Sequence, residues 1–338
     1  MTENQQNNKR IKAVMPSVAS FKVNYESEED LKDKICKKLG IEPEFTNLIF
    51  VDVDEDLIPI SAEELEDYKD EREELEKPLK IVIVDYIWAR QMIALKDKQR
   101  LLREAKALVV GAGALGNEIV KNLVWLGFGK VLIVDYDDVE FSNVSRGLFE
   151  KEDIGRNKAE VLAEKIGTNS PYAEIEALSA RVEECDSEQL KCDVILSALD
   201  NMPTRIWLVS FCVKNAIPLI DGGVKEFQGR IQTYIPNGPC LACNIPMDRY
   251  AEIMELSNPC EGLEFGAIAS FSTVGSIVAG VQANEAMKII AGLPTLKGVL
   301  LMDFLKSNYS IMPLSRNMGC FVCGKDSLKT VSLENEEK

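Results

Sequence analysis

The chain has 338 residues, of which 46% are hydrophobic and 28% charged, as is typical of a globular protein with one large or two modest domains. Its net charge of −16 disfavours a nucleic-acid role, because contacts to phosphates need a basic surface. It contains no histidine, which excludes imidazole as a general base and restricts any zinc site to cysteine or carboxylate ligands. Nine cysteines, no recognisable signal peptide and no apolar run long enough for a bilayer lead us to expect a cytoplasmic protein with reduced thiols.

A polar tail at 1–8, which we expect to be disordered, precedes a predicted small domain at 9–86. Its predicted elements are strands at 9–15, 21–25, 48–53 and 79–84 and helices at 28–39 and 62–76. This order resembles a ubiquitin-like β-grasp, a small α+β fold. Residues 1–86 carry 12 basic and 22 acidic side chains and thus most of the excess negative charge. A basic protein partner and a merely solvated surface both fit that charge.

A helical connector at 86–105 leads to the larger predicted domain. Its predicted elements, in chain order, are a strand at 107–110, a helix at 117–126, a strand at 131–134, a helix at 158–166, a strand at 194–197, a helix at 204–215, strands at 218–220 and 227–235 and a helix at 270–290. The alternation of strands and helices predicts an α/β fold with a Rossmann-like, doubly wound mixed sheet, in which the strand at 227–235 is antiparallel. Ligands of such sheets bind at the carboxyl ends of the strands.

A glycine-rich loop, Gly111-Ala-Gly113-Ala-Leu-Gly116, joins the first of these strands to the first helix. Glycines at this spacing let backbone N–H groups approach a phosphate at the helix N-terminus. Asp135 lies 19 positions beyond Gly116, at the end of the next strand, where its carboxylate can accept ribose hydroxyls. The loop therefore predicts a nucleotide, and both NAD and ATP fit it.

Three charged residues downstream favour ATP. Arg146 and Lys158 are cations of the kind that stabilise a triphosphate, and Asp200 is a carboxylate of the kind that holds Mg²⁺. A dehydrogenase has no need of two cations directed at the phosphates. Surface charges beside a nucleotide fold would explain any one of these residues, but not all three in this order.

Two C-x-x-C pairs follow, Cys240-Leu-Ala-Cys243 and Cys320-Phe-Val-Cys323, with 76 residues between them. Pairs of thiols at this spacing are typical of a structural zinc site, whereas ordinary buried thiols have no reason to occur in two such pairs. We therefore expect Zn²⁺ to join the end of the chain to the nucleotide-binding fold.

From about residue 86 to 324 the sequence resembles the ThiF/MoeB and ubiquitin-activating enzyme superfamily. The matching motifs are VVGAGALG, D-x-D-x-V-x-x-SN-x-x-R, G-x-x-K, LDN and the two C-x-x-C pairs. The resemblance implies an adenylation domain at 87–325, followed by a disordered tail at 326–338. It also implies an activity, which is adenylation with ATP of the C-terminal glycine of a ubiquitin-like protein. Many relatives then capture the acyl group on a cysteine as a thioester.

The resemblance also implies site residues. Those implied to bind ATP are Gly111, Gly113, Gly116, Asp135, Asp137, Asn143, Arg146, Lys158, Asp200 and Asn201. Among them the glycines would cradle the nucleotide, Asp135 and Asp137 would serve the ribose, Asn143, Arg146 and Lys158 would bind the triphosphate, and Asp200 would hold Mg²⁺. Arg90 matches an arginine that acts on the ATP of a partner subunit, which predicts a homodimer. The sequence departs from the family pattern at Ile87, Ala114 and Gly147, and only the first of these departures is expected to weaken adenylation.

One of the five remaining cysteines is the predicted acyl acceptor. Cys36, Cys192 and Cys212 are expected to be small buried hydrophobes, and acidic neighbours would raise the pKa of Cys185 and reduce its reactivity. Cys260 instead lies in a loop that matches the crossover loop of single-domain relatives, where the catalytic cysteine resides. An inert loop thiol is the alternative, because Glu261 and Glu264 are nearby.

The function predicted from the sequence is activation of a ubiquitin-like modifier, with a carrier ending in Gly-Gly and a conjugating enzyme as partners. Adenylation needs no histidine, because the attacking carboxylate is already ionised. A sulfur-carrier adenylyltransferase for thiamin, molybdopterin or tRNA thiolation remains an alternative. A catalytically silent nucleotide-binding scaffold is another, and an NAD-dependent dehydrogenase is a third.

Overall fold

The structure is a computed structural model that describes residues 10–13, 19–22, 28–39, 46–51, 57–59, 79–85, 88–170, 172–246 and 271–324. The chain divides into two compact units, Met1–Arg100 and Leu101–Lys338. The predicted boundary between 86 and 87 stays a prediction. In the described part of the chain, no helix is both long enough and apolar enough to span a membrane.

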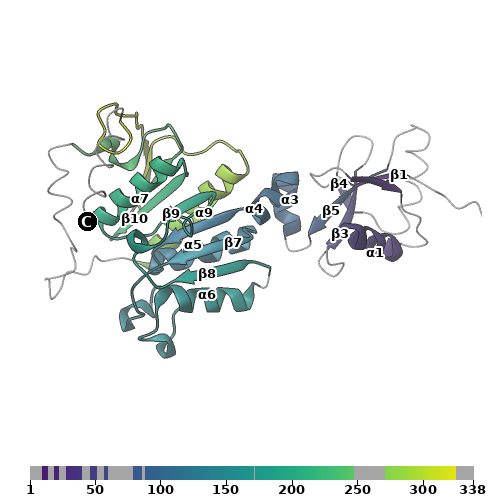
Figure 1. Ribbon diagram of the computed structural model, residues 1–338, viewed down its shortest axis with the longest axis horizontal. Coiled ribbons are helices and arrows are strands. Elements are labelled where there is room, and N and C mark those ends of the chain that lie inside the picture. Colours follow the sequence, from purple (N-terminus) through teal and green to yellow (C-terminus); the bar gives the residue numbers. More distant parts are fainter. Residues whose placement is uncertain are drawn as a thin grey trace, which may run out of the picture. The chain divides into compact units, whose positions relative to one another are not determined.

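The first unit contains a five-stranded mixed sheet in the order β2-β1-β5-β3-β4 (Figure 1). The strands are β1 (Arg10–Ala13), β2 (Ala19–Lys22), β3 (Thr46–Val51), β4 (Leu57–Pro59) and β5 (Leu79–Asp85). β1 pairs in parallel with β5, and the other neighbours pair antiparallel. Leu31 and Ile35 of helix α1 (Glu28–Leu39) are fully buried, as the predicted helical spacing requires. This arrangement agrees with the predicted β-grasp, to which it adds β4, and the helix predicted at 62–76 lies outside the described residues.

Short helices follow β5 along the chain, and the last of them crosses the boundary between the two units. They are α3 (Ala89–Leu95), a single turn at Lys96–Lys98 and α4 (Gln99–Glu104). These helices agree with the helical connector predicted at 86–105, and the positive φ of 53° at Lys96 divides it into separate short helices.

The second unit is built on an eight-stranded sheet in the order β13-β12-β11-β10-β9-β6-β7-β8. The strands are β6 (Lys106–Val110), β7 (Lys130–Val134), β8 (Glu174–Leu178), β9 (Val194–Ser197), β10 (Leu219–Lys225), β11 (Gln228–Tyr234), β12 (Val299–Asp303) and β13 (Asn308–Met312). The strands from β10 to β8 are parallel, and those from β10 to β13 are antiparallel. The predicted doubly wound mixed sheet is therefore confirmed.

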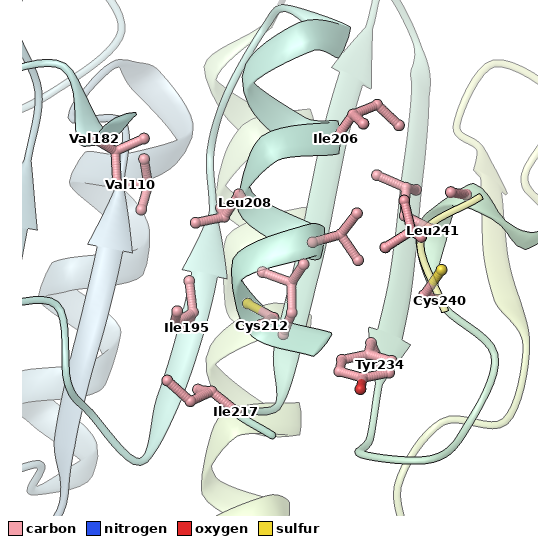
Figure 2. Packing of buried hydrophobic residues seen from close by; sticks show 14 of the residues in the cluster. Val110, Val182, Ile195, Ile206, Leu208, Cys212, Ile217, Tyr234, Cys240 and Leu241 are labelled. Carbon is pink, nitrogen blue, oxygen red and sulfur yellow. The ribbon is translucent and has the colours of Figure 1, made fainter. Parts of the chain in front are cut away.

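Four helices cover this sheet, α5 (Ala114–Leu126), α6 (Lys158–Asn169), α7 (Met202–Asn215) and α9 (Ser272–Ile290). α9 packs against α5 and against β10 and β11. α7 lies on the opposite face of the strands, as Figure 2 shows, and both faces of the central strands are thereby removed from water. This explains why β6, β7 and β9 are nearly continuous apolar runs rather than alternating ones.

The core under α7 continues into the cysteine pairs. Leu208 and Cys212 of α7 pack toward Ile195 of β9 and Tyr234 of β11, and the cluster extends to Cys240 (Figure 2). Burying a side chain of this kind stabilises the folded state by about 1.5–3 kcal/mol. The cysteine pairs are thus part of the hydrophobic core and fix the chain near 240 against the sheet.

Candidate functional site

The glycine loop lies at the carboxyl end of β6. At each of its three glycines, a side chain would have a different consequence. Gly111 has φ +99°, and a Cβ there would lie 2.7 Å from the carbonyl oxygen of Ala198. A Cβ on Gly116 would lie 1.9 Å from the carbonyl oxygen of Gly111, so helix α5 can approach the loop only without a side chain there. A Cβ on Gly113 would meet nothing within 4 Å. Gly113 is the N-cap of α5, and the open space beside it is where a ligand can reach the helix N-terminus.

Asp135 at the end of β7 is bound to the glycine loop. Its Oδ2 accepts the N–H of Ala112 at 2.6 Å, and its Oδ1 accepts the N–H of Asp137 at 2.8 Å. Burial raises the pKa of Asp135, although these two N–H groups and the charge of Lys158 act in the opposite direction. The carboxylate is 9% exposed, so little of it is open to solvent and its orientation is fixed by the backbone.

Asn157 connects the N-terminus of α6 to the loop that follows β7. Its Oδ1 accepts the N–H groups of Ala159 and Glu160 as the N-cap of the helix. Its Nδ2 donates to the carbonyl oxygens of Asp135 and Asp137 at 3.0 and 3.1 Å. One amide therefore holds the helix and the acidic loop in a fixed relationship.

Lys158 follows directly and lies against the same loop. Its N–H donates to the carbonyl oxygen of Asp137 at 2.9 Å, and its Nζ lies 3.0 Å from Asp137 Oδ2. The lysine side chain is 12% exposed and the Asp137 side chain 48%. The fold thus brings together the glycine loop, Asp135, Asp137 and Lys158, which are distant in sequence.

Arg146 and Asn143 lie on the segment after β7. Asn143 ends a single helical turn (Phe141–Asn143), and its Oδ1 accepts the N–H of Glu140 at 2.8 Å. Arg146 Nε donates to the carbonyl oxygen of Ser142 at 3.2 Å. Both side chains are partly exposed.

Asp200 and Asn201 follow β9, and Ala198, the residue directly after that strand, lies close to Gly111 of the glycine loop. Asp200 is exposed, so a cation from solution can reach its carboxylate. Asn201 is the N-cap of α7, with its Oδ1 accepting the N–H of Thr204 at 2.9 Å. The resemblance implied that Asn201 binds the nucleotide, and in the structure its side chain caps α7.

Arg205, Asp221 and Arg230 form a charged cluster, which was not predicted from the sequence and which contacts the chain at Leu199, next to Asp200. Arg205 of α7 donates through Nη1 to both oxygens of Asp221, at 2.8 and 2.7 Å, and through Nη2 to the carbonyl oxygen of Leu199. Arg230 of β11 also donates to Asp221. A buried acidic residue in a strand whose neighbours are apolar is the sequence signal that indicates such a pair.

For Arg90 and Cys260 the structure gives no position relative to the glycine loop. Arg90 lies on α3 of the first unit and is exposed. Cys260 lies outside the described residues. Their predicted roles stay predictions.

The four cysteines of the C-x-x-C pairs converge to a single cluster. Their Sγ atoms all lie within 4.8 Å of one another, and all four residues are buried. The separations are 3.7 Å for Cys240 and Cys320, 3.9 Å for Cys240 and Cys243, and 3.4 Å for Cys243 and Cys323. Tetrahedral zinc with Zn–S bonds of about 2.3 Å requires sulfur atoms about 3.8 Å apart, so this donor set fits the ion. The hydrogen bond between Cys240 and Cys320 lowers the pKa of Cys320 and raises that of Cys240, so zinc binding is inferred from the geometry of the four sulfur atoms.

Three further cysteines are described, and none is an activated thiol. Burial raises the pKa of Cys212 well above its usual value and that of Cys192 to about 12. Burial and the neighbouring Glu184 and Glu183 raise the pKa of Cys185, as its acidic surroundings predicted. Cys212 is buried as predicted, whereas Cys192 and Cys185 are only partly buried.

The fold and this site together define a class, a doubly wound nucleotide-binding protein with a four-cysteine cluster in its core. The ThiF family profile matches residues 88–322. The chain is 32% identical over 246 residues to the SAMP-activating enzyme E1 of Haloferax volcanii, which covers 70% of this chain and 86% of that protein. It is also 32% identical over 238 residues to the sulfur carrier protein ThiS adenylyltransferase of Escherichia coli, covering 69% and 90%.

The fold is found among solved structures as well. The crystal structure of E. coli MccB with ATP matches at a TM-score of 0.60 and 21% identity, over 70% of this chain and 73% of that one. The chain belongs to the ThiF family.

Proposed function

We propose that the protein adenylates the C-terminal glycine of a ubiquitin-like or sulfur-carrier protein with ATP. The observation that carries this proposal is the convergence of Gly113, Asp135 and Lys158 at one sheet edge, in a chain of the ThiF family. Its relatives named above are, by name, a SAMP-activating enzyme and an adenylyltransferase of the sulfur carrier protein ThiS.

In the proposed reaction, an oxygen of the carrier's carboxylate attacks the α-phosphorus of ATP. The bond from that phosphorus to the bridging oxygen breaks, and pyrophosphate leaves with the electron pair. Lys158, Arg146 and Asn143 would hold the triphosphate, and the open N-terminus of α5 at Gly113 would face a phosphate. Bound at Asp200, Mg²⁺ would supply charge neutralisation of the phosphates.

We further propose a thioester step on Cys260. Its thiolate would attack the acyl carbon of the adenylate, forming a C–S bond while AMP leaves with the oxygen, and the thiol proton would pass to water. The pKa values of Cys185, Cys192 and Cys212 make these thiols poor competitors, which supports a role for a cysteine elsewhere. Handing the acyl group to a conjugating enzyme would follow.

The active species is proposed to be a homodimer with structural Zn²⁺ in the cysteine cluster. Arg90 of each subunit would act on the ATP of the other, since a single adenylation unit with one such arginine suggests reciprocal exchange. Cytoplasmic location stays a prediction.

The experiment that tests this proposal is intact-mass analysis under non-reducing conditions after incubation with Mg-ATP and small proteins that end in Gly-Gly. A thiol-sensitive adduct that Cys260→Ala abolishes would support modifier activation. An acyl adenylate without an adduct would favour the sulfur-carrier function, in line with the ThiS adenylyltransferase relative. Neither product with any carrier, together with absent ATP–pyrophosphate exchange, would contradict the proposal and favour the silent scaffold.

A further inference from the structure

Two arginines share one buried carboxylate on the face of the sheet that α7 covers. Asp221 of β10 is 2% exposed and accepts from Arg205 of α7 and from Arg230 of β11. The Arg205 side chain is 9% exposed, while that of Arg230 is 31% exposed. Of the two arginines, Arg205 is therefore shielded from solvent and Arg230 is accessible to it.

The cluster has more positive charge and more donors than its acceptors satisfy. Two guanidinium groups and one carboxylate leave a net charge of +1, and the surplus charge can be assigned to Arg230, whose side chain reaches solvent. Gln232 is the cross-strand partner of Asp221, so its side chain lies on the same face. Gln232 is 3% exposed, and its Nε2 has no hydrogen-bond partner among the described residues. A surplus of donors beside an accessible guanidinium is the composition of a site for an anion or a carbonyl-rich chain.

The cluster is connected to the reaction centre through a single residue. Arg205 Nη2 donates to the carbonyl oxygen of Leu199, the residue directly before Asp200. β10 and β9 are neighbouring parallel strands, and Asp221 is in register with Ser197 at the end of β9. Arg230 of β11 pairs with Gly223, two residues beyond Asp221 toward the carboxyl end of β10. It therefore lies toward the end of the sheet at which the nucleotide is proposed to bind.

We propose that this cluster binds the C-terminal carboxylate of the carrier protein, with Arg230 as the residue that contacts it. The inference deepens the adenylation function proposed above and rests on it. A carboxylate that approaches a triphosphate is repelled by it, and a guanidinium beside the carboxylate offsets that repulsion and orients the attacking oxygen. Arg205 acts as a positioning residue, since it joins Asp221 to the chain before Asp200 and is too buried to meet the carrier.

The competing interpretation is that the cluster only pins β10 to β11 and α7. The two interpretations differ in the form of the peptide they recognise. A purely structural cluster gives no reason to distinguish a free carboxylate from a carboxamide, whereas a receptor for the carboxylate must distinguish them.

The test is a binding titration of the full chain by NMR with two synthetic peptides of one sequence. One ends in Gly-Gly with a free carboxylate, and the other ends in Gly-Gly-carboxamide. The proteins are the wild type, Arg230→Gln, Arg230→Lys and Lys225→Gln. The Lys225→Gln variant removes an exposed cation from the neighbouring strand and serves as the charge control. ATP affinity and the melting temperature of each variant are measured in parallel, so that loss of the fold is recognised.

We expect the wild type and Lys225→Gln to bind the carboxylate peptide at least about 10-fold more tightly than the carboxamide, as one charge-assisted hydrogen bond contributes. Arg230→Gln should lose this preference while it retains its ATP affinity, and Arg230→Lys should retain part of it. Equal binding of the two peptides by the wild type, or an unchanged preference in a folded Arg230→Gln variant, would overturn the proposal. A preference for the carboxylate without any acyl adenylate would keep this inference and contradict the proposed function instead.

Discussion

Lys158 Nζ lies 3.0 Å from Asp137 Oδ2, and this ion pair occupies the edge of the sheet where the triphosphate is proposed to bind. Seven residues further along α6, Lys165 lies 3.0 Å from Asp153 and 2.7 Å from Glu150. The same helix therefore carries one lysine at the proposed site and one in a separate acidic cluster. Substitutions of Lys158 and Lys165 can therefore be compared as losses of one positive charge each from the same helix.

We predict that Lys158→Met lowers kcat/KM in ATP–pyrophosphate exchange by about 100-fold to 1,000-fold, because a preorganised charge at the transferring phosphate is lost. Lys165→Met should leave exchange within about threefold and lower stability by about 1–3 kcal/mol, because it removes the lysine partner of the buried Asp153. Exchange kinetics at varied ATP, with thermal melts of both variants, measure this. Equal losses in the two variants would show that α6 acts only as a structural support.

Asn157 gives a second prediction, because its amide has two functions that a substitution can separate. Asn157→Asp keeps an oxygen for the helix N-cap but removes both donors to the carbonyl oxygens of Asp135 and Asp137. The variant should lose about 1–3 kcal/mol of stability, since buried acceptors are left facing a carboxylate. Its KM for ATP should also rise, because the link that places Lys158 beside the loop is lost. Denaturant titration and exchange kinetics measure the two effects, and Asn157→Ser serves as a variant that keeps a cap without adding charge. An unchanged KM for ATP in a folded Asn157→Asp variant would contradict the positioning role.

Much of this site could be predicted from the sequence, because its signals are local. The apolar run before Gly111 and the spacing to Asp135 placed the loop and the second strand, and both are found as predicted. The two C-x-x-C pairs predicted a cluster that the fold indeed brings together.

Three strands were missed: β12, whose sequence VLLMD is an apolar run that could have been recognised, and β8 and β13, which lack such a local signal. β8 carries glutamates at positions 174 and 176 at the edge of the sheet, and all of β13 is exposed, so neither reads as an apolar strand. The link between Arg205 and Asp221 depends on α7 packing over β10, which is a tertiary contact. The tether from Asn157 likewise depends on how α6 returns to the sheet.

The glycine loop provides a third prediction, which separates ligand binding from folding. Gly113→Ala should fold with nearly wild-type stability, because its Cβ meets nothing within 4 Å, yet it should weaken ATP binding by filling the space beside the helix N-terminus. Gly116→Ala should be destabilised by several kcal/mol or fail to fold, because its Cβ would lie 1.9 Å from the carbonyl oxygen of Gly111. Melting temperature and nucleotide titration of the two variants check this. A destabilised Gly113→Ala or a stable Gly116→Ala would contradict the roles assigned to these glycines.

The cysteine cluster gives a prediction about metal removal. We expect about one zinc ion per chain by elemental analysis, because four buried thiols at these separations match one tetrahedral site. Chelation should lower the melting temperature of the second unit by more than about 5 °C, since the pairs tie Cys240 and Cys320 together across the core. Cys323→Ser should retain less zinc and melt lower, whereas Cys185→Ser should not. A full complement of zinc in Cys323→Ser would place the ion elsewhere.

The thiols outside the cluster give a prediction that depends on pH. A raised pKa leaves less thiolate at a given pH, and the thiolate is the species that iodoacetamide attacks. Cys192, whose burial raises its pKa to about 12, and Cys212 should therefore remain unmodified in the folded protein near pH 7. Cys185 should react slowly near pH 7, and its rate should increase as the pH rises through the alkaline range, because burial and Glu184 raise its pKa.

If Cys260 is the acyl acceptor, it should be the first site labelled at pH 7 and should be protected once an acyl group is attached. Peptide mapping by mass spectrometry after timed labelling measures each site. Labelling of Cys185 ahead of Cys260 near neutral pH would contradict the assignment of Cys260 as the reactive thiol.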